Sequence, residues 1–152
     1  MKKLDKHLFK IVAKAAPLVS IDILIKNENL ILLGKRINKP AKGYFFSIGG
    51  RIMKNETTNR ALKRIMNSEL NIQLKSSPKF IDIFEHFYKH GIFDGISSHY
   101  VGLLFEYEVE DNIDLKCLPN DQHNEYKWFS INQIMIDTQV HNNVKDYFKT
   151  NI

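Results

Sequence analysis

The chain has 152 residues, of which 43% are hydrophobic, and it carries 22 basic side chains, 17 acidic side chains and one cysteine. This size and composition predict one domain, residues 1–152, that buries its core without disulfides, and they exclude a disordered or disulfide-rich chain. A lone Cys117 is typical of a reducing compartment, so we expect a cytoplasmic protein. Charged residues such as Asp5 and Lys6 interrupt the apolar N-terminal run, so we expect neither an export signal nor a membrane span.

The charge is unevenly divided along the chain. Residues 1–75 carry 16 basic and 5 acidic side chains, whereas residues 76–152 carry 6 basic and 12 acidic ones. The basic half predicts an anionic ligand. The acidic second half disfavours a continuous groove for nucleic acid, so a small phosphorylated ligand fits better.

The first predicted element is a basic amphipathic helix that ends before Pro17. Its apolar positions recur at helical spacing: Leu4, Leu8, Ile11, Val12 and Ala15. Such a helix can lie on a membrane surface, but its few large apolar side chains favour packing on its own domain or on a second subunit.

A β-hairpin and a short strand are expected next. Residues 18–26 place Val19, Ile21, Ile23 and Ile25 on one face, and Asn27-Glu28-Asn29 turns the chain into residues 30–36. Residues 44–48 predict one short strand, and Gly49-Gly50 then frees the backbone from ordinary steric limits.

The second half of the chain predicts a helix, a long hairpin, a strand and two more helices. Residues 57–70 have a clear helical stripe with Asn71 as a left-handed C-cap, and residues 80–88 and 97–109 pair as a hairpin. Residues 126–129 predict a short strand, and Ser130 with Gln133 predicts a capping box directly after it. Val140, Val144, Tyr147 and Phe148 predict a last helix. The order favours an α/β fold with a mixed sheet and helices on both faces.

Glu69 is the most informative single residue. At about 100° per residue, it falls between Ile65 and Met66 on the apolar stripe of the helix at 57–70. An unpartnered buried carboxylate costs several kcal/mol, so this position needs a cation or hydrogen-bond donors. A metal ion would serve, and so would an Arg or Lys from elsewhere; a frayed helix end would instead leave Glu69 in water.

Residues 49–72, GGRIMKNETTNRALKRIMNSELNI, resemble the Nudix box G-x5-E-x7-R-E-U-x-E-E-x-G-U, in which U is apolar. The matching residues are Gly50, Glu56, Arg64, Met66, Glu69 and Ile72. The departures are Ile65 and Ser68, which replace glutamates, and Asn71, which replaces glycine. The resemblance implies a Nudix-type α/β/α sandwich with a mixed β-sheet, and the lost carboxylates imply fewer bound ions than in a typical Nudix site. We interpret Glu56 as a residue that supports the start of the helix.

Further motifs, spread over nearly the whole chain, are similar to the GDP-mannose mannosyl hydrolase branch of that superfamily: PLVSID, LLGKR, KPAKGYF, GGR, HFY, HYV, and DQH followed by YKW. The resemblance implies a single Mg²⁺ held by the Gly49 carbonyl, Glu69 and Gln122. It also implies that water attacks the anomeric carbon of GDP-mannose, and possibly of GDP-glucose, with inversion, and that the enzyme is a homodimer.

The same resemblance implies the roles of the other site residues. His123 would be the general base, Arg36 would neutralise charge on the departing GDP, and Arg51 would contact the diphosphate or the sugar. The remaining substrate contacts would be Asp22, His86 and Tyr100. From residue chemistry alone, His123 is also compatible with a histidine in a surface loop and Arg51 with a solvated loop arginine.

Two other functions stay open. One is conventional pyrophosphate cleavage of another nucleoside diphosphate derivative, which the loss of glutamate at positions 65 and 68 disfavours. The other is a non-catalytic module that binds a nucleotide sugar, which the joint presence of Glu69, Gln122 and His123 disfavours. Ile48 stands where this family commonly has proline, and we expect a looser loop and weaker activity for that reason.

Overall fold

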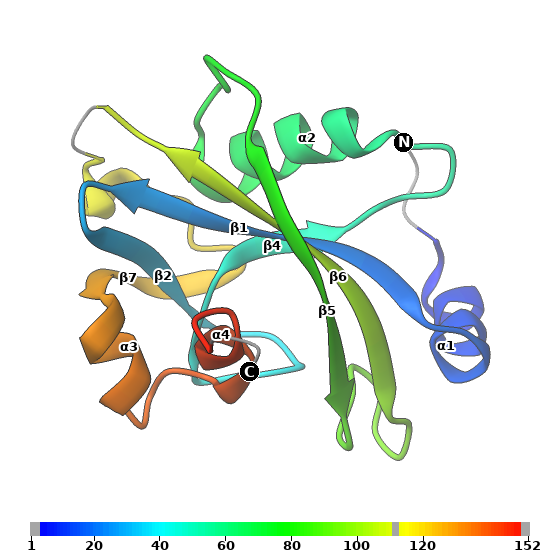
Figure 1. Cartoon of the computed structure of the whole chain (residues 1–152). Coiled ribbons are helices and arrows are strands. Elements are labelled where there is room, and N and C mark those ends of the chain that lie inside the picture. The colour runs from blue at the N-terminus through cyan, green and yellow to red at the C-terminus, as the bar shows by residue number, and fades with distance from the viewer. Residues whose placement is uncertain (1–3, 111–112, 150–152) are drawn as a thin grey trace.

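The computed structural model describes residues 4–110 and 113–149 of the chain, which fold into a mixed β-sheet with helices on both faces (Figure 1). This is the expected α/β Nudix sandwich. The elements, in chain order, are α1 Lys6–Ala15, β1 Leu18–Asn27, β2 Leu30–Arg36, β3 Phe45–Phe46, β4 Ile48–Arg51, α2 Thr58–Leu70, β5 Lys79–Tyr88, β6 Ser98–Glu108, the 3₁₀ helix η1 Leu115–Cys117, β7 His123–Ser130, α3 Ile131–Ile136 and α4 Asn142–Asp146.

Seven strands form the sheet, in the order β3-β2-β1-β6-β5, with β4 paired to β1 and β7 paired to β2. Only β1 and β6 run parallel among these pairs, and the others are antiparallel. Both expected hairpins are confirmed. The first turns at Glu28, which adopts a left-handed φ of 53°, and aligns Ile25 with Leu32. The second pairs β5 with β6.

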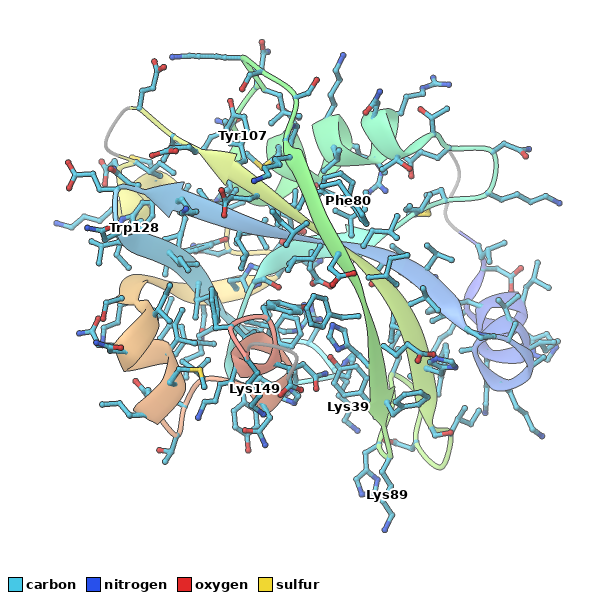
Figure 2. All side chains as sticks on the ribbon, in the orientation of Figure 1. Lys39, Phe80, Lys89, Tyr107, Trp128 and Lys149 are labelled. Atoms are coloured by element: carbon cyan, nitrogen blue, oxygen red, sulfur yellow. The ribbon has the colours of Figure 1, made fainter. Side chains whose placement is uncertain are left out.

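The core has one apolar cluster on each face of the sheet. The first cluster lies under α2 and contains Ile21, Ile23 and Ile25 of β1, all fully buried; Tyr107 and Trp128, labelled in Figure 2, belong to it. The second lies under α3 and α4 and contains Leu24, Leu33, Phe129 and Val144 among others. Because both faces of β1 are covered, this strand can hold a polar side chain only where a partner or a cavity meets it.

Both ends of α2 carry residues of types that commonly cap helices. The Thr57 side chain accepts a hydrogen bond from Arg60 N–H at the start, and Asn71 ends the helix with a left-handed φ of 54°. The capping box at Ser130 and Gln133 is also present at the start of α3. Helix start and end were therefore predictable from the side chains alone.

One strand prediction was wrong, and another gave too short a strand. Residues 44–48 do not form one strand, because Ser47 separates β3, which pairs with β2, from β4, which pairs with β1. β1 pairs with β2 only through Ile25–Asn27. Residues Ser20–Ile23 of β1 therefore have a free edge on that side, and β4 pairs with them there. β7 begins at His123, earlier than expected, because its polar first residues continue to pair with β2 as far as Arg36.

α1 lies beside the start of β1, as Figure 1 shows, and contributes to a third, smaller cluster. Ala13 of α1 packs with Leu18 and Tyr100, and Phe9 meets Phe93 with ring centroids 5.4 Å apart. Packing on its own domain is thus what this helix does in the structure. Among the described residues, no helix combines the length and the apolar character needed to cross a bilayer.

Candidate active site

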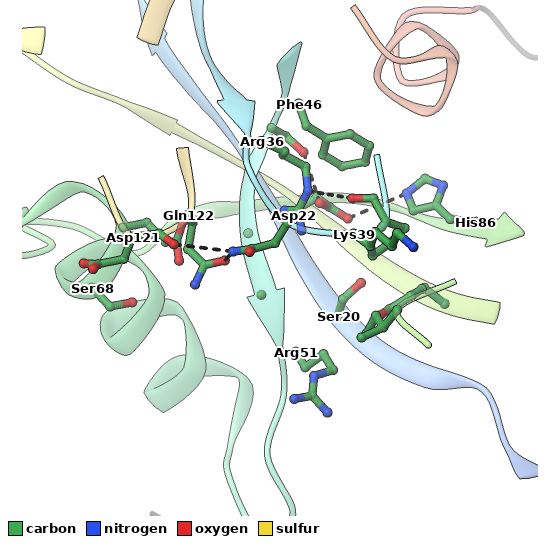
Figure 3. A pocket seen from close by; sticks show the side chains of 18 of the residues that line it. Ser20, Asp22, Arg36, Lys39, Phe46, Arg51, Ser68, His86, Asp121 and Gln122 are labelled. Carbon is green, nitrogen blue, oxygen red and sulfur yellow. Dashed lines mark hydrogen bonds and ion pairs between the residues drawn. The ribbon is translucent and has the colours of Figure 1, made fainter. Parts of the chain in front are cut away.

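A cavity of about 660 Å³ opens between the sheet, the end of α2 and the loop before β7 (Figure 3). This volume is in the range of small-molecule sites. The cavity brings together most of the site residues expected from the sequence: Asp22, Arg36, Gly49, Arg51, Glu69, His86, Tyr100 and Gln122. His123 does not line it. Residues from β1, β2, β4, β5, β6 and α2 meet there, so the site exists only once the sheet has formed.

The three expected metal ligands, Gly49, Glu69 and Gln122, all line the cavity. Gly49 faces Asp22 across the β1–β4 pair, and a Cβ at position 49 would lie 2.4 Å from the Ile21 carbonyl oxygen, so only glycine allows this approach. Glu69 is the last but one residue of α2, and its side chain is 11% exposed. The frayed-end interpretation of Glu69 is therefore excluded. Gln122 accepts a hydrogen bond from Asn38 Nδ2 at 3.0 Å.

These residues fit a hard divalent cation. A backbone carbonyl, a carboxylate and a side-chain amide all offer oxygen, which Mg²⁺ prefers over nitrogen and sulfur. In residues 4–110 and 113–149, no three His, Cys, Asp or Glu side chains gather as a metal cluster. Of the three expected ligands, only Glu69 supplies a carboxylate.

His123 is buried behind Glu69. Its side chain is 1% exposed, and its Nδ1 lies 3.4 Å from Glu69 Oε2. The surface-loop interpretation of His123 is therefore wrong. The ring packs against Gly34, where an added Cβ would lie 2.5 Å from His123 Cγ. Neither ring nitrogen has a hydrogen bond to any residue that the structure describes.

The protonation state of His123 follows from this burial. Desolvation, with a smaller contribution from the charge of Arg36, lowers the pKa of His123 to about 3. The imidazole is therefore neutral near pH 7, and its contact with Glu69 joins a neutral ring and a carboxylate.

Two arginines line the cavity from different strands. Arg36, at the end of β2, donates a hydrogen bond from Nε to the Pro40 carbonyl at 2.9 Å, and its guanidinium lies 5.9 Å from the centre of the Phe46 ring. Arg51, at the end of β4, stacks on Phe9 of α1 with its Cζ only 3.7 Å from the ring centre. Burial lowers the pKa of Arg51. Both cations are thus held in place before a ligand arrives.

Asp22 and His86 line the cavity next to each other, and Asp22 also borders Gly49 across the β1–β4 pair. Asp22 is 6% exposed, and its Oδ1 accepts a hydrogen bond from Ser47 Oγ at 3.0 Å. Its Oδ2 lies 3.7 Å from His86 Nε2. Gly102 of β6 leaves room for this pair, because a Cβ there would lie 3.0 Å from Asp22 Oδ2. Tyr100 is 8% exposed and lines the same cavity.

Glu56 and Arg64 of the box brace the loop before α2, and Arg64 also lines the cavity. Both Glu56 oxygens accept hydrogen bonds from Arg64, at 2.7 and 2.8 Å, and Arg64 also donates to the Arg51 carbonyl at 2.8 Å. Arg64 is the main cause of the lowered pKa of Glu56. Glu56 also accepts a hydrogen bond from Met53 N–H at 2.9 Å, so it holds the loop before α2 as well as the helix.

Several cavity residues were missed in the sequence. They include Ser20, Asn38, Lys39, Phe46, Ser47, Tyr88 and Asp121. Ser20 alternates with Asp22 on β1, which is a signal that could have been used. Asn38 and Lys39 belong to a loop, and no pattern in the neighbouring sequence indicates that this loop lines the cavity.

A model of the NUDIX domain matches residues 16–150, so the chain belongs to the NUDIX domain family. The fold and the cavity define a Nudix hydrolase, a class that generally uses divalent metal ions and acts on small nucleotide derivatives. The chain is similar to the low-salt glycan biosynthesis protein Agl8 of Haloferax volcanii. The two are 39% identical over 115 residues, which cover 74% of this chain and 70% of that protein.

Solved structures share the fold at lower identity. A MutT NUDIX hydrolase from Burkholderia pseudomallei matches with a TM-score of 0.69 and 21% identity over 90% of this chain and 98% of that one. A MutT protein from Methanosarcina mazei matches with a TM-score of 0.68 and 21% identity over 87% and 91%. The NUDIX domain of Shewanella oneidensis NrtR, complexed with ADP ribose, matches with a TM-score of 0.65 and 11% identity over 97% and 100%.

Proposed function

We propose that this protein hydrolyses GDP-mannose, with GDP-glucose as a related substrate, to GDP and the free sugar. The observation that carries the proposal is the composition of one cavity, which combines cations for a diphosphate with a single helix-borne carboxylate. The similarity to a protein named for glycan biosynthesis supports a nucleotide sugar as the substrate class. Water would attack the anomeric carbon with inversion.

The altered box favours attack at carbon over attack at phosphorus. Ile65 is 1% exposed and packs in the cluster under α2, while Ser68 donates a hydrogen bond to the Ile65 carbonyl at 3.3 Å. Neither position offers the carboxylate that a typical Nudix box has there. Attack at phosphorus in such sites relies on several metal ions that activate water and bridge phosphates. α2 supplies one carboxylate to the cavity, that of Glu69.

Departure of GDP requires that its growing negative charge be neutralised. The Gly49 carbonyl, Glu69 and Gln122 would hold one Mg²⁺, which when bound supplies positive charge to the diphosphate. Arg36 and Arg51 supply further charge, and a guanidinium can bind phosphate oxygens in a bidentate manner. Because hydrogen bonding and stacking already hold both arginines, little reorganisation is needed when the bond breaks.

The attacking water must lose a proton, and we propose His123 as the acceptor. Its imidazole is neutral and so has a lone pair for this purpose, but the burial that lowers its pKa makes it a weak base in the position it now holds. Because the ring lies behind Glu69, the proposal requires that ligand binding turn His123 toward the cavity. Asp22, His86 and Tyr100 would make further contacts to the sugar nucleotide.

The test is hydrolysis of GDP-mannose with Mg²⁺ in ¹⁸O-labelled water, followed by mass analysis of the products. We expect the label in mannose, because the oxygen of water joins the anomeric carbon. Label in GDP, or the products GMP and mannose 1-phosphate, would show attack at phosphorus and favour the conventional Nudix reaction. Binding of GDP-mannose in a calorimeter without any product would favour the non-catalytic module.

The stack of Arg51 on Phe9 gives a second prediction. Phe9→Ala should raise the KM for GDP-mannose about fivefold with kcat nearly unchanged, because a cation–π contact worth about 1 kcal/mol no longer restrains the guanidinium. Steady-state kinetics measures both constants. Leu8→Ala is the matched control, since Leu8 lies on the same helix but is 44% exposed. Equal KM values for the two variants would contradict a role of Phe9 at Arg51.

A further inference from the structure

We propose that Asn38, in the loop between β2 and β3, is a positioning residue for Gln122. Its side-chain nitrogen Nδ2 donates to Gln122 Oε1, which fixes the rotation of the Gln122 amide and leaves one lone pair of that oxygen for a cation. The link to the cation rests on the proposed function, in which Gln122 is a ligand of Mg²⁺, whereas the contact between the two amides does not.

One nitrogen of Asn38 makes two contacts with the segment before β7. Nδ2 lies 3.0 Å from Gln122 Oε1 and 3.4 Å from the carbonyl oxygen of Asp121. A backbone carbonyl can only accept a hydrogen bond, so the Asn38 atom that faces it is the amide nitrogen. The same nitrogen pairs with an acceptor at Gln122, which identifies the facing atom there as the oxygen. One backbone carbonyl thus sets the orientation of both amides.

The backbone holds Asn38 beside Gln122 independently of the two side chains. The Ile37 N–H donates to the Gln122 carbonyl at 3.0 Å, so the residue before Asn38 is already attached to this segment. On the other side, the Pro40 carbonyl accepts a hydrogen bond from Arg36 Nε at 2.9 Å, and Pro40 is buried. Asn38 therefore reaches Gln122 from a loop that is fixed on both sides of it.

The orientation of the Gln122 amide matters for a cation. Asn38 and Gln122 both line the cavity. A half-turn of the last side-chain bond exchanges the oxygen of a glutamine amide for its NH₂ group, which offers a cation no lone pair. In residues 4–110 and 113–149, no other side chain forms a hydrogen bond with the Gln122 amide. Without Asn38 the amide would turn more easily, and part of the molecules would present NH₂ to the cation.

Binding of Mn²⁺, which accepts the same oxygen ligands as Mg²⁺, gives a direct test. Electron paramagnetic resonance of the unbound ion measures the dissociation constant of the native protein, Asn38→Ala, Gln122→Ala and the double variant. We expect Asn38→Ala to raise this constant about fivefold, which is the ordinary contribution of one hydrogen bond. The double variant should bind as weakly as Gln122→Ala and no more weakly, because Asn38 acts through Gln122. An unchanged constant in Asn38→Ala, or losses that multiply in the double variant, would overturn the proposal.

Asn124→Ala is the matched control. Asn124 follows Gln122 closely in the chain and belongs to β7, but it is exposed and does not line the cavity. This variant should keep the native dissociation constant for Mn²⁺. A loss of equal size in Asn124→Ala would show that any truncated side chain near the start of β7 loosens the site, and it would overturn a specific role of Asn38.

The Gln122→Ala variant separates this inference from the proposed function. If the native protein binds no Mn²⁺, or if Gln122→Ala binds it equally well, the proposed metal site fails. Nitrogen relaxation of the Gln122 side-chain amide then still decides the contact, and loss of its NMR signals in Gln122→Ala assigns them. We expect this amide to be more mobile on the picosecond to nanosecond timescale in Asn38→Ala than in the native protein. Equal mobility in the two proteins would overturn the role of Asn38.

Discussion

Glu69→Gln is expected to lower kcat/KM for GDP-mannose on the order of a thousandfold, which corresponds to about 4 kcal/mol of transition-state stabilisation. Glu69 supplies the only carboxylate among the proposed Mg²⁺ ligands, and glutamine keeps its size while removing its charge. Without that charge the ion binds weakly, and the departing diphosphate loses a cation. Initial rates over a range of Mg²⁺ and substrate concentrations measure this effect.

Thermal unfolding of the same variant separates metal binding from folding. A ligand that binds only the folded state raises the unfolding temperature, so Mg²⁺ with GDP should stabilise the native protein but not Glu69→Gln. Without ligand, the unfolding free energy of the variant should stay the same or rise by about 1 kcal/mol, because a largely buried charge has been removed. Glu125→Gln, at a side chain 54% exposed, is the control and should change neither quantity. Full activity of Glu69→Gln would contradict the proposal that Glu69 binds Mg²⁺.

His123→Ala should lower kcat about a hundredfold or more while the affinity for GDP-mannose stays within about twofold. This is the ordinary contribution of a general base, which acts on the proton of water and not on the bound ground state. Single-turnover kinetics and calorimetry measure the two quantities. His99→Ala is the control, because that ring stacks on Phe87 outside the cavity, 4.3 Å between centres.

Gly34→Ala tests the same base without removing it. A methyl group at position 34 would occupy the place of the His123 ring, so the ring must move. We expect a loss of kcat similar to that of His123→Ala, with the imidazole still present. If His123→Ala keeps its kcat, His123 is not the base, whatever the effect of Gly34→Ala.

The elements that sequence reasoning predicted well are those whose signals are local. The hairpin of β1 and β2 follows from alternation and a turn, and α2 follows from its apolar stripe and its C-cap, Asn71. The position of Glu69 on the inner side of α2 also follows from helical periodicity alone. These features depend on neighbours within a few residues, so the order of amino acids is enough to specify them.

The strand prediction that was wrong and the one that was too short both concern pairing with distant segments. Residues 44–48 have the composition of one strand, but the open edge of β1 takes up Ile48–Arg51 and breaks the run at Ser47. His123 has no strand propensity of its own, and its pairing with Arg36 on β2 draws it into β7. Strand boundaries are set by the partner strand, which no local pattern identifies.

The amino-acid sequence alone determined the likeness to the Nudix box, the missing carboxylates at Ile65 and Ser68, and the residue types that a phosphorylated ligand needs. Tertiary structure alone decided that Asp22, Arg36 and Glu69 share one cavity, that His123 lies behind Glu69, and which unexpected partners hold the site. Phe9 at Arg51 and Asn38 at Gln122 are such partners. Their contacts join residues far apart in the chain, and such contacts arise only when the packed sheet fixes the distance between them.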